Sequence, residues 1–470
     1  MVRRVRMVAV GGTMKWRVMV EVTGEDGAVT RHVSSEDERT EVGQAATLGL
    51  SLAEGKATLS GLQRVLVTAQ AYAHCRRRRR CSHCGALRPL KDHRTRKLVS
   101  LFGTVEVRAP RFGHCHCGVA CRRSLTPVAE MMPDRCTPEY ERVLAEMGSA
   151  LPYRRARALL AELLPLDTAP DVETIRRRTL QVGARLERAA LVPPDEGSPA
   201  PAQTITLAID AGHVKSVRTY QMRSFEVMIA RAANDEGQEV VFGSMPAEAD
   251  RQVKQLYHVL RRLGATATTP VTILSDGAEG PRSLAGAASS GPVRHVLDWF
   301  HLSMRVQHVA QAVKGWAAAE PDAAERTMTI ADAVSRVRWR LWHGQTERAL
   351  GLIGDTLTDL DVLLKAADDR QARKVATLLR TLETYVAGQA NLIIDYAAAR
   401  GQGDPISTAT TESTVQRLLH RRMGANQQMR WSPRGAHRML KVRIAVMNGT
   451  FAADHAAAEP YAGRPFRPAA

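Results

Sequence analysis

The chain has 470 residues, about three times the length of a typical ~150-residue domain, so several domains are expected. It carries 66 Lys and Arg residues against 48 Asp and Glu residues, and the net charge of +18 favours a polyanionic partner, nucleic acid before a membrane surface. No run of about 18 apolar residues occurs, which excludes a transmembrane helix. The N-terminus is basic, but its apolar run breaks at Gly11-Gly12 and it lacks a convincing signal-peptide cleavage site, so the sequence predicts a cytoplasmic protein.

The first 74 residues predict a hairpin followed by a helix. Residues 14–33 alternate apolar and polar side chains around a turn at 24–27, which is typical of a β-hairpin. Residues 59–73 carry apolar side chains at helical spacing and predict a helix.

The cysteines predict a metal site. All seven lie between Cys75 and Cys136 of a long chain, and this odd, clustered set favours metal binding over a disulfide framework. Two short motifs, 81–84 and 114–117, flank residues 94–112, which predict a hairpin turning near Gly103 that would bring the motifs together. Because tetrahedral Zn²⁺ takes about four thiolate or imidazole ligands, we expect a zinc ribbon over residues 75–127. The expected ligands are Cys81, Cys84, Cys115 and Cys117, with His83, His114, His116 and Cys121 close enough to substitute and unliganded thiols as the alternative.

Arginines before residue 192 are candidate DNA contacts. A run of them directly precedes the first cysteine motif, where phosphate contact is favoured over a merely solvated charge run. Within a helical region over 128–191, residues 138–164 and 171–190 predict helices that break near Pro165, which fits a helix-turn-helix or, equally, an amphipathic pair with a basic outer face. The candidate DNA-binding residues are Arg76, Arg77, Arg78, Arg79, Arg80, Arg176, Arg177 and Arg178.

A stretch rich in Pro, Gly and Ser at 192–203 predicts a linker, and the pattern beyond it is α/β. A helix is predicted at 248–263, between the third and fourth of a series of apolar strands. The predicted strands are 204–210, 223–232, 238–245, 270–276 and 292–298.

Asp210 and Asp276 each end one of these strands. At that position a side chain projects into the crevice at the edge of the sheet, where α/β proteins usually bind ligands. Two carboxylates there would repel each other unless a cation such as Mg²⁺ separates them, and a pair of such ions can promote phosphodiester chemistry. The alternative is ordinary turn chemistry after a strand.

The rest of the chain predicts helices. Residues 302–400 form an Ala- and Arg-rich helical stretch, and residues 410–423 predict one further helix. Glu412 lies in the first turn of that helix, where a capping carboxylate is the alternative to a third site acid. Asp298, which ends the last predicted strand, and nearby His301 could likewise serve only to cap the next helix.

These elements and their local strings resemble the RNase H-like core of DDE transposases, with acids on the first strand, the fourth strand and a late helix. Over residues 75–450 the chain is similar to bacterial insertion-sequence transposases of the ISKra type, which are related to the Mutator-like group. The strings are Leu207-Ala208-Ile209-Asp210-Ala211-Gly212, Leu274-Ser275-Asp276-Gly277, Asp298-Trp299-Phe300-His301, Thr411-Glu412-Ser413-Thr414-Val415-Gln416, Arg421-Arg422-Met423 and Met429-Arg430-Trp431-Ser432.

The resemblance implies that Asp210, Asp276 and Glu412 ligate two Mg²⁺ or Mn²⁺ ions and that Asp298 and His301 lie near the active site. Arg421 and Arg422, in the Glu412 helix, join the candidate DNA-binding residues. The implied fold is multidomain, with a zinc ribbon and a helical DNA-binding region before an α/β RNase H-like core. That core spans 204–301 and 406–450, with an all-α insertion at 302–405 and a tail at 451–470.

The expected activity is DNA transposition: cutting at the ends of an insertion sequence and joining the 3′-hydroxyls to target DNA. The expected partners are double-stranded DNA, as terminal repeats and target, and at least one second copy of the chain, in the nucleoid of the bacterial cytoplasm. No Gly-rich phosphate loop occurs, so a nucleotide cofactor is not expected. The rival interpretations are a domesticated, non-catalytic DNA-binding regulator and a stand-alone nuclease of the same fold.

Overall fold

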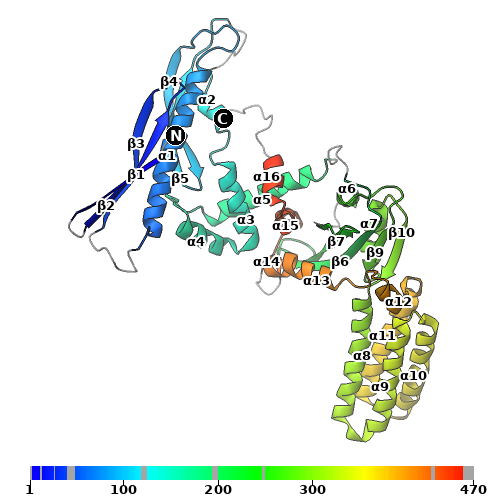
Figure 1. Cartoon of the computed structure of the whole chain (residues 1–470). Helices are drawn as coiled ribbons and strands as arrows, with labels where there is room; N and C mark the ends of the chain where they lie inside the picture. The colour runs from blue at the N-terminus through cyan, green and yellow to red at the C-terminus, as the bar shows by residue number, and fades with distance from the viewer. Residues whose placement is uncertain are drawn as a thin grey trace. The chain divides into compact units, whose positions relative to one another are not determined.

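The chain is a multidomain α/β protein that divides into two compact units (Figure 1). Unit 1 comprises Met1–Leu186 and Phe451–Ala470, and unit 2 comprises Glu187–Thr450. Among the residues described, no helix combines the length and low polarity needed to cross a membrane. The computed structural model describes residues 3–10, 13–25, 27–39, 48–117, 124–192, 199–245, 249–424 and 429–458, with only the backbone for 3–10, 13, 249, 250, 409, 410 and 412. Most of the predicted linker, residues 193–198, lies outside this description.

Unit 1 begins with an antiparallel sheet in the order β1-β2-β3, followed by helix α1. The predicted hairpin is confirmed as β2 and β3, whereas β1 was not predicted. Helix α1 starts well before residue 59, because Ser51 and Glu54 form a reciprocal capping box. The elements are β1 (Arg3–Val10), β2 (Thr13–Thr23), β3 (Val29–Arg39) and α1 (Leu52–Arg78).

The hairpin predicted near Gly103 is confirmed as β4 (Leu90–Ser100) and β5 (Gly103–Phe112). Gly103 has a φ of 102°, a conformation that glycine adopts at little cost. Alternate residues of β5, such as Val105 and Val107, are buried against apolar side chains of α1 and the short helix α2 (Pro127–Met131). The hairpin is thereby fixed to α1, whose last turn leads into the first cysteine motif.

The helical region of unit 1 contains α3 (Pro138–Ala150), α4 (Tyr153–Leu163) and α5 (Val172–Ala189). The prediction of one helix over 138–164 is wrong, because α3 ends at Ala150 and α4 begins at Tyr153, with Leu151 and Pro152 as the capping residues between them. Proline disfavours helical geometry in the residue before it, which explains the break.

The first part of the predicted tail at 451–470 is helical. Residues Phe451–Ala457 form helix α16, while residues 459–470 lie outside the described part of the chain. His455 of α16 lies 3.4 Å from buried Glu141 of α3, and Arg185 of α5 binds the same carboxylate. The helix therefore returns to complete unit 1.

Unit 2 is built on a mixed sheet in the order β10-β9-β6-β7-β8. Strand β7 is antiparallel to both β6 and β8, whereas β9 and β10 run parallel to β6, and each predicted strand is confirmed. One face of β6 carries Leu207 and Ile209, which are buried against the helices α6 (Ala249–Arg262) and α7 (Glu279–Ala288). The strands are β6 (Ile205–Lys215), β7 (Ser224–Asn234), β8 (Glu239–Ser244), β9 (Val271–Ser275) and β10 (Val293–Leu297).

The other face of this sheet meets the helices that follow β10. Ala208 and Leu274 join the apolar core of a helical bundle whose longer helices run side by side (Figure 1). The bundle helices are α8 (Trp299–Ala319), α9 (Ala324–Trp342), α10 (Thr346–Ala366), α11 (Arg370–Gly388) and the short α12 (Tyr396–Gly401).

The predicted helix at 410–423 is present as α13 (Ala409–Val415), a π-helical segment (Gln416–His420) and α14 (Arg421–Met423). Helix α15 (Pro433–Met447) follows and packs on β8, where Gly243 approaches Leu440 and Ile444 closely.

Candidate functional site

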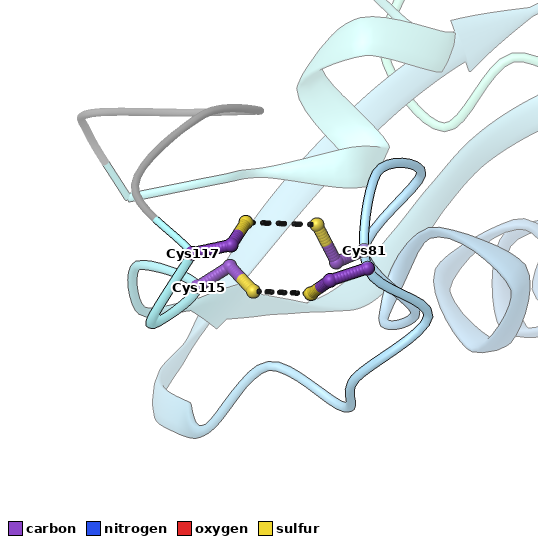
Figure 2. Close-up of side chains that lie close together, drawn as sticks. Cys81, Cys115 and Cys117 are labelled. Atoms are coloured by element: carbon purple, nitrogen blue, oxygen red, sulfur yellow. Dashed lines mark hydrogen bonds between the residues drawn. The ribbon is translucent and has the colours of Figure 1, made fainter.

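Four cysteine thiols converge from two loops that flank the same end of the β4–β5 hairpin. Figure 2 shows Cys81, Cys115 and Cys117 pointing toward one another. The sulfur of Cys84 lies 3.1 Å from that of Cys115, and the sulfur of Cys81 lies 3.7 Å from that of Cys117. All four sulfurs lie within 4.8 Å of one another. Around a tetrahedral zinc ion with Zn–S bonds of ~2.3 Å, neighbouring sulfurs lie about 3.8 Å apart, which is within this limit. The cluster could therefore bind a metal ion such as zinc.

The backbone prepares this cluster for a cation. The loop after Cys81 turns back through Gly85, which has a φ of 72°, and the N–H of Gly85 donates to the Cys81 carbonyl at 3.0 Å. The backbone N–H groups of Cys84 and His83 donate to the sulfur of Cys81 and lower the pKa of its thiol to about 6. A thiolate is the form that binds metal, so this loop favours the metal-binding form of Cys81. The side-chain hydrogen bond with Cys84 instead raises the pKa of Cys115.

Among the residues that the structure describes, the other candidate ligands do not join this group. His83, His114 and His116 are described but do not belong to the cluster of close ligand atoms, and Cys121 lies outside the described residues. Cys75 and Cys136 are buried elsewhere in unit 1, and burial raises the pKa of both thiols.

The arginine run beside the cysteines forms the last turn of α1 and the residues after it. Arg78 Nε donates to Glu130 at 2.8 Å, Arg77 Nε lies 3.7 Å from a Glu25 carboxylate oxygen, and Arg79 Nε donates to a backbone carbonyl. The positive charges stabilise the C-terminal end of the helix dipole. Their role in DNA binding stays a prediction, and the exposed members of the run are Arg76, Arg77, Arg79 and Arg80.

The arginines of α5 differ from one another in surroundings. Arg176 is exposed and pairs with Glu173 at 2.7 Å, and Arg177 is also exposed. Arg178 is only 18% exposed and binds Asp134 and buried Glu141. Arg178 therefore fastens α5 to α3 and the segment before it, while the two exposed arginines face solvent.

In unit 2, Asp210, Asp276 and Asp298 lie at one edge of the sheet, as strand register shows. Ala208 pairs with Leu274, so Asp210 and Asp276 each follow that pair by two residues. Leu297 pairs with Ser275, and the N–H of Asp298 donates to the Ser275 carbonyl at 2.8 Å.

One detail of this edge differs from the prediction, because β6 does not end at Asp210. The strand continues to Lys215 along β7, although its parallel pairing with β9 stops at Ala208. Asp210 is therefore held by a strand on one side only. The N–H groups of Ala211 and Ala278 donate to Asp210 and Asp276 at 2.7 and 2.9 Å.

Asp298 is fully buried and caps α8, accepting from the N–H of Phe300 at 2.9 Å. It also accepts from His301 Nδ1 at 2.6 Å and from the backbone N–H of Thr408 at 2.9 Å. Burial alone would raise the pKa of Asp298, but the hydrogen bonds from His301 and Thr408 outweigh it and hold the pKa below its usual range. The capping role considered for Asp298 is thus confirmed, together with a pairing to His301.

His301 connects this buried aspartate to the other two carboxylates. Its hydrogen bond to Asp298 raises the pKa of the imidazole. The negative charges of Asp210 and Asp276 raise the pKa of His301 further. The His301 side chain is 23% exposed, so the ring is accessible at this edge of the sheet.

Helix α11 braces the turn after β9, a contact that sequence reasoning missed. Tyr385 Oη donates to the Asp276 carbonyl at 2.7 Å, and Gln389 Nε2 donates to the Gly277 carbonyl at 3.3 Å. Gly277 has a φ of 89°, and a Cβ there would lie 2.7 Å from Gln389. Arg305 of α8 stacks its guanidinium 3.9 Å from the centre of the Tyr385 ring. The helical bundle therefore fixes the backbone that carries Asp276.

Glu412 lies in α13, and the structure describes only its backbone. Helix α13 runs against β6 and β7. A Cβ at Gly212 would lie 3.1 Å from Val415 and 2.4 Å from Leu419, so glycine permits the close approach two residues after Asp210. Glu412 precedes Val415 by three residues, one helical turn.

The arginines that follow Glu412 are placed differently from each other. Arg421 is exposed, whereas Arg422 is 1% exposed. The guanidinium of Arg422 lies 5.3 Å over the Trp431 ring and donates to Met429 Sδ at 3.0 Å. Arg422 therefore lies inside the fold in this conformation, and its predicted DNA contact is untested.

No protein-family model matches the chain, and no curated protein is similar enough to align with it. Among solved structures, the chain is similar to the Drosophila P element transposase strand transfer complex, at 12% identity and a TM-score of 0.35. That match covers 67% of this chain and 93% of the other. At this level of likeness, the match determines neither the fold nor the activity.

Proposed function

We propose that the chain is a DDE-type DNA transposase of the ISKra type, with an RNase H-like core in unit 2. The observation that carries the proposal is the pair of carboxylates, Asp210 and Asp276, at one edge of the unit 2 sheet. Numbered along the chain from β6, its strand order is 3-2-1-4-5 with the second strand antiparallel to the others, which is the topology of RNase H-like folds. Asp210 and Asp276 follow the paired ends of its first and fourth strands, as the DDE arrangement requires. Because fold alone does not define function, the carboxylates rather than the topology support the activity.

In this proposal Asp210, Asp276 and Glu412 hold two Mg²⁺ or Mn²⁺ ions. The half-buried Asp210 and Asp276 are oxygen donors suited to such hard cations, and their mutual repulsion favours a cation between them. Bound metal would activate water or a 3′-hydroxyl and stabilise the leaving oxygen of a phosphodiester. The chain's own contribution is positioning: strand register sets Asp210, the Tyr385 brace sets the Asp276 backbone, and Gly212 lets α13 approach.

His301 acts in this proposal as a cation at the acidic edge. Its pKa is raised, so the imidazolium persists toward neutral pH, where it can bind a phosphate oxygen or give up a proton. Asp298 positions the ring through Nδ1 and stays ionised. Asp298 is fully buried, so its carboxylate is shielded from water.

DNA binding is assigned to unit 1 together with basic residues of the core. The cysteine cluster would hold Zn²⁺ in a ribbon, and the exposed arginines beside it and on α5 would contact backbone phosphates. Double-stranded terminal repeats and target DNA are the proposed substrates, and action on two ends calls for at least a homodimer on DNA. The proposed location is the bacterial nucleoid.

The test uses purified full-length protein, DNA carrying the sequences that flank the coding region with a free 3′-hydroxyl, and a supercoiled target plasmid in Mg²⁺. We expect joined products from the wild-type chain, and none from Asp210→Asn although DNA binding is retained. Cleavage without joining would instead favour the stand-alone nuclease. Binding with neither reaction would favour the regulator. Joining by Asp210→Asn at the wild-type rate would refute the assignment.

A further inference from the structure

Unit 2 contains a cavity of about 360 Å³ whose lining does not include Asp210, Asp276 or Asp298. It lies between the end of β8, the start of α6 and the first turns of α15. Its floor is polar and buried: Gln252 donates to Ser244 at 2.9 Å, and the ammonium of Lys441 donates to Gln255 at 2.6 Å. The cavity also has Glu187, Met245, Arg251, Pro433, Arg434, His437 and Arg438 along its walls.

Among the described lining side chains, positive charges outnumber negative ones. The lining contains three arginines, Arg251, Arg434 and Arg438, and one carboxylate, Glu187. That carboxylate is shared, because His437 Nε2 lies 3.3 Å from it and Arg251 Nη1 lies 3.8 Å from it.

Arg438 is the side chain whose surroundings point to a missing anion. Its Nε is buried without a hydrogen-bond partner among the described residues. Burial lowers the pKa of Arg438, and the positive charge of nearby Arg434 lowers it further. A buried guanidinium nitrogen without an acceptor is costly, and an anion in the cavity would supply that acceptor.

The start of α15 adds to this positive environment. Ser432 caps the helix, and Pro433 and Arg434 of its first turn line the cavity. The first turn of a helix presents N–H groups and the positive end of the dipole, which favour an anion.

Strand register places the cavity at the same edge of the sheet as Asp210. Ala211 pairs with Met228 of β7, and Met228 pairs with Ser244 of β8 at the cavity floor. Ser244 is therefore level with Ala211 and lies two strands away, about 10 Å at the usual strand spacing. One DNA strand that crosses Asp210 could reach the cavity with another of its phosphates.

We propose that this cavity binds a backbone phosphate of the DNA on which the acidic edge acts, with Arg434 and Arg438 as its ligands. The identity of that DNA rests on the proposed function, whereas phosphate binding by the cavity does not. Inorganic phosphate offers the same chemistry, and the test separates these two sources.

The test measures binding of a fluorescent duplex to the full chain over a series of KCl concentrations without Mg²⁺. Each lost phosphate contact lowers the magnitude of the slope of log affinity against log salt by about 0.9. Because Arg434 and Arg438 bind the same phosphate, we expect a decrease of at most that size for Arg434→Gln and for Arg438→Gln. The control is Arg262→Gln, an exposed arginine at the far end of α6 from the cavity, which should leave the slope unchanged. Arg434 is exposed, so its substitution does not endanger the core.

The same variants are titrated with inorganic phosphate by calorimetry. Phosphate binding that Arg438→Gln abolishes, together with a reduced DNA slope, supports the proposal. Phosphate binding with an unchanged DNA slope shows a free-phosphate site and overturns it, as does wild-type behaviour of both variants in both assays. The measurement involves no strand cleavage, so a reduced slope stands even if the chain joins no DNA ends. Joining with unchanged slopes refutes the cavity proposal alone.

Discussion

The cysteine cluster of unit 1 and the acidic edge of unit 2 are both groups of potential metal ligands, but they are built differently. The cluster places four sulfurs within 4.8 Å of one another, and its loops are tied to the ends of a single hairpin. At the acidic edge, the strands fix Asp210 and Asp276 through their register, and among the described side chains no third acid completes a group as tight as the thiols.

The two ligand arrangements are suited to different roles. A set of four protein ligands around one point fills the coordination of zinc and leaves no position for a substrate, which is the pattern of a structural site. Carboxylates spaced along an edge leave coordination positions open to water and phosphate oxygens, which is the pattern of a catalytic site for Mg²⁺. Removing a ligand should therefore affect folding at the first site and chemistry at the second.

The largest expected effect is on unit 1. Cys84→Ser should reduce bound zinc from one ion per chain to none. The loss should destabilise unit 1, because structural zinc contributes of the order of 10 kcal/mol to the folding free energy of its small domain. Elemental analysis measures the metal, and limited proteolysis should show new cleavage near the cysteine motifs. Cys75→Ala, which removes a buried thiol outside the cluster, should keep its zinc. Full zinc content in Cys84→Ser would show that this thiol is not a ligand.

Asp276→Asn should leave folding intact and reduce strand transfer by about 10³-fold, because metal-assisted charge stabilisation supplies several kcal/mol. The asparagine oxygen can still accept from the N–H of Ala278, so the turn is preserved. Thermal denaturation and a joining assay separate the two effects, with Asp332→Asn on the surface of α9 as control. A large loss of stability with unchanged specific activity would make Asp276 a structural residue instead.

The pairing of Asp298 with His301 predicts a pH dependence. Because the folded pKa of His301 is raised above 6.5, its cation is fully present below pH 6.5 and is lost as pH rises through the raised value. Joining that depends on the cation should fall over that window. Asp298→Asn keeps a helix cap but weakens the pairing with His301, so the fall in joining rate should move to lower pH. At a fixed pH within that window, the rate should drop about tenfold for each unit by which the pKa of His301 is lowered. Superimposable pH profiles would exclude a role for the imidazolium.

The smallest effect concerns the brace on the acidic edge. Tyr385→Phe removes the hydrogen bond to the Asp276 carbonyl, which is worth about 1 kcal/mol. We expect a loss of roughly threefold to tenfold in joining rate without weaker DNA binding. Tyr257→Phe, at a partly exposed tyrosine on α6, is the matched control. Equal rates for the two variants would show that the brace does not position Asp276.

Patterns in short stretches of the sequence predicted the features that depend on residues close together along the chain. The strands of unit 2, the hairpin at Gly103 and the cysteine cluster follow from apolar periodicity and motif spacing, and Asp210 and Asp276 were found because apolar runs stop at them. The break at Pro152 was missed by reading amphipathic periodicity across a proline. Tyr385 donates to Asp276, 109 positions away in the sequence, and no pattern within a short stretch of sequence predicts such a contact.

The central claim, that Asp210 binds the catalytic metal, is tested most directly by changing the ligand atom. Asp210→Cys replaces a carboxylate with a softer thiolate, which disfavours Mg²⁺ and better accepts Mn²⁺. We measure the joining of DNA ends by wild-type and variant chains in each metal, with zinc content held constant. We expect Asp210→Cys to be inactive in Mg²⁺ and to recover joining in Mn²⁺. Wild-type joining by Asp210→Cys in Mg²⁺ would show that Asp210 does not bind the catalytic metal.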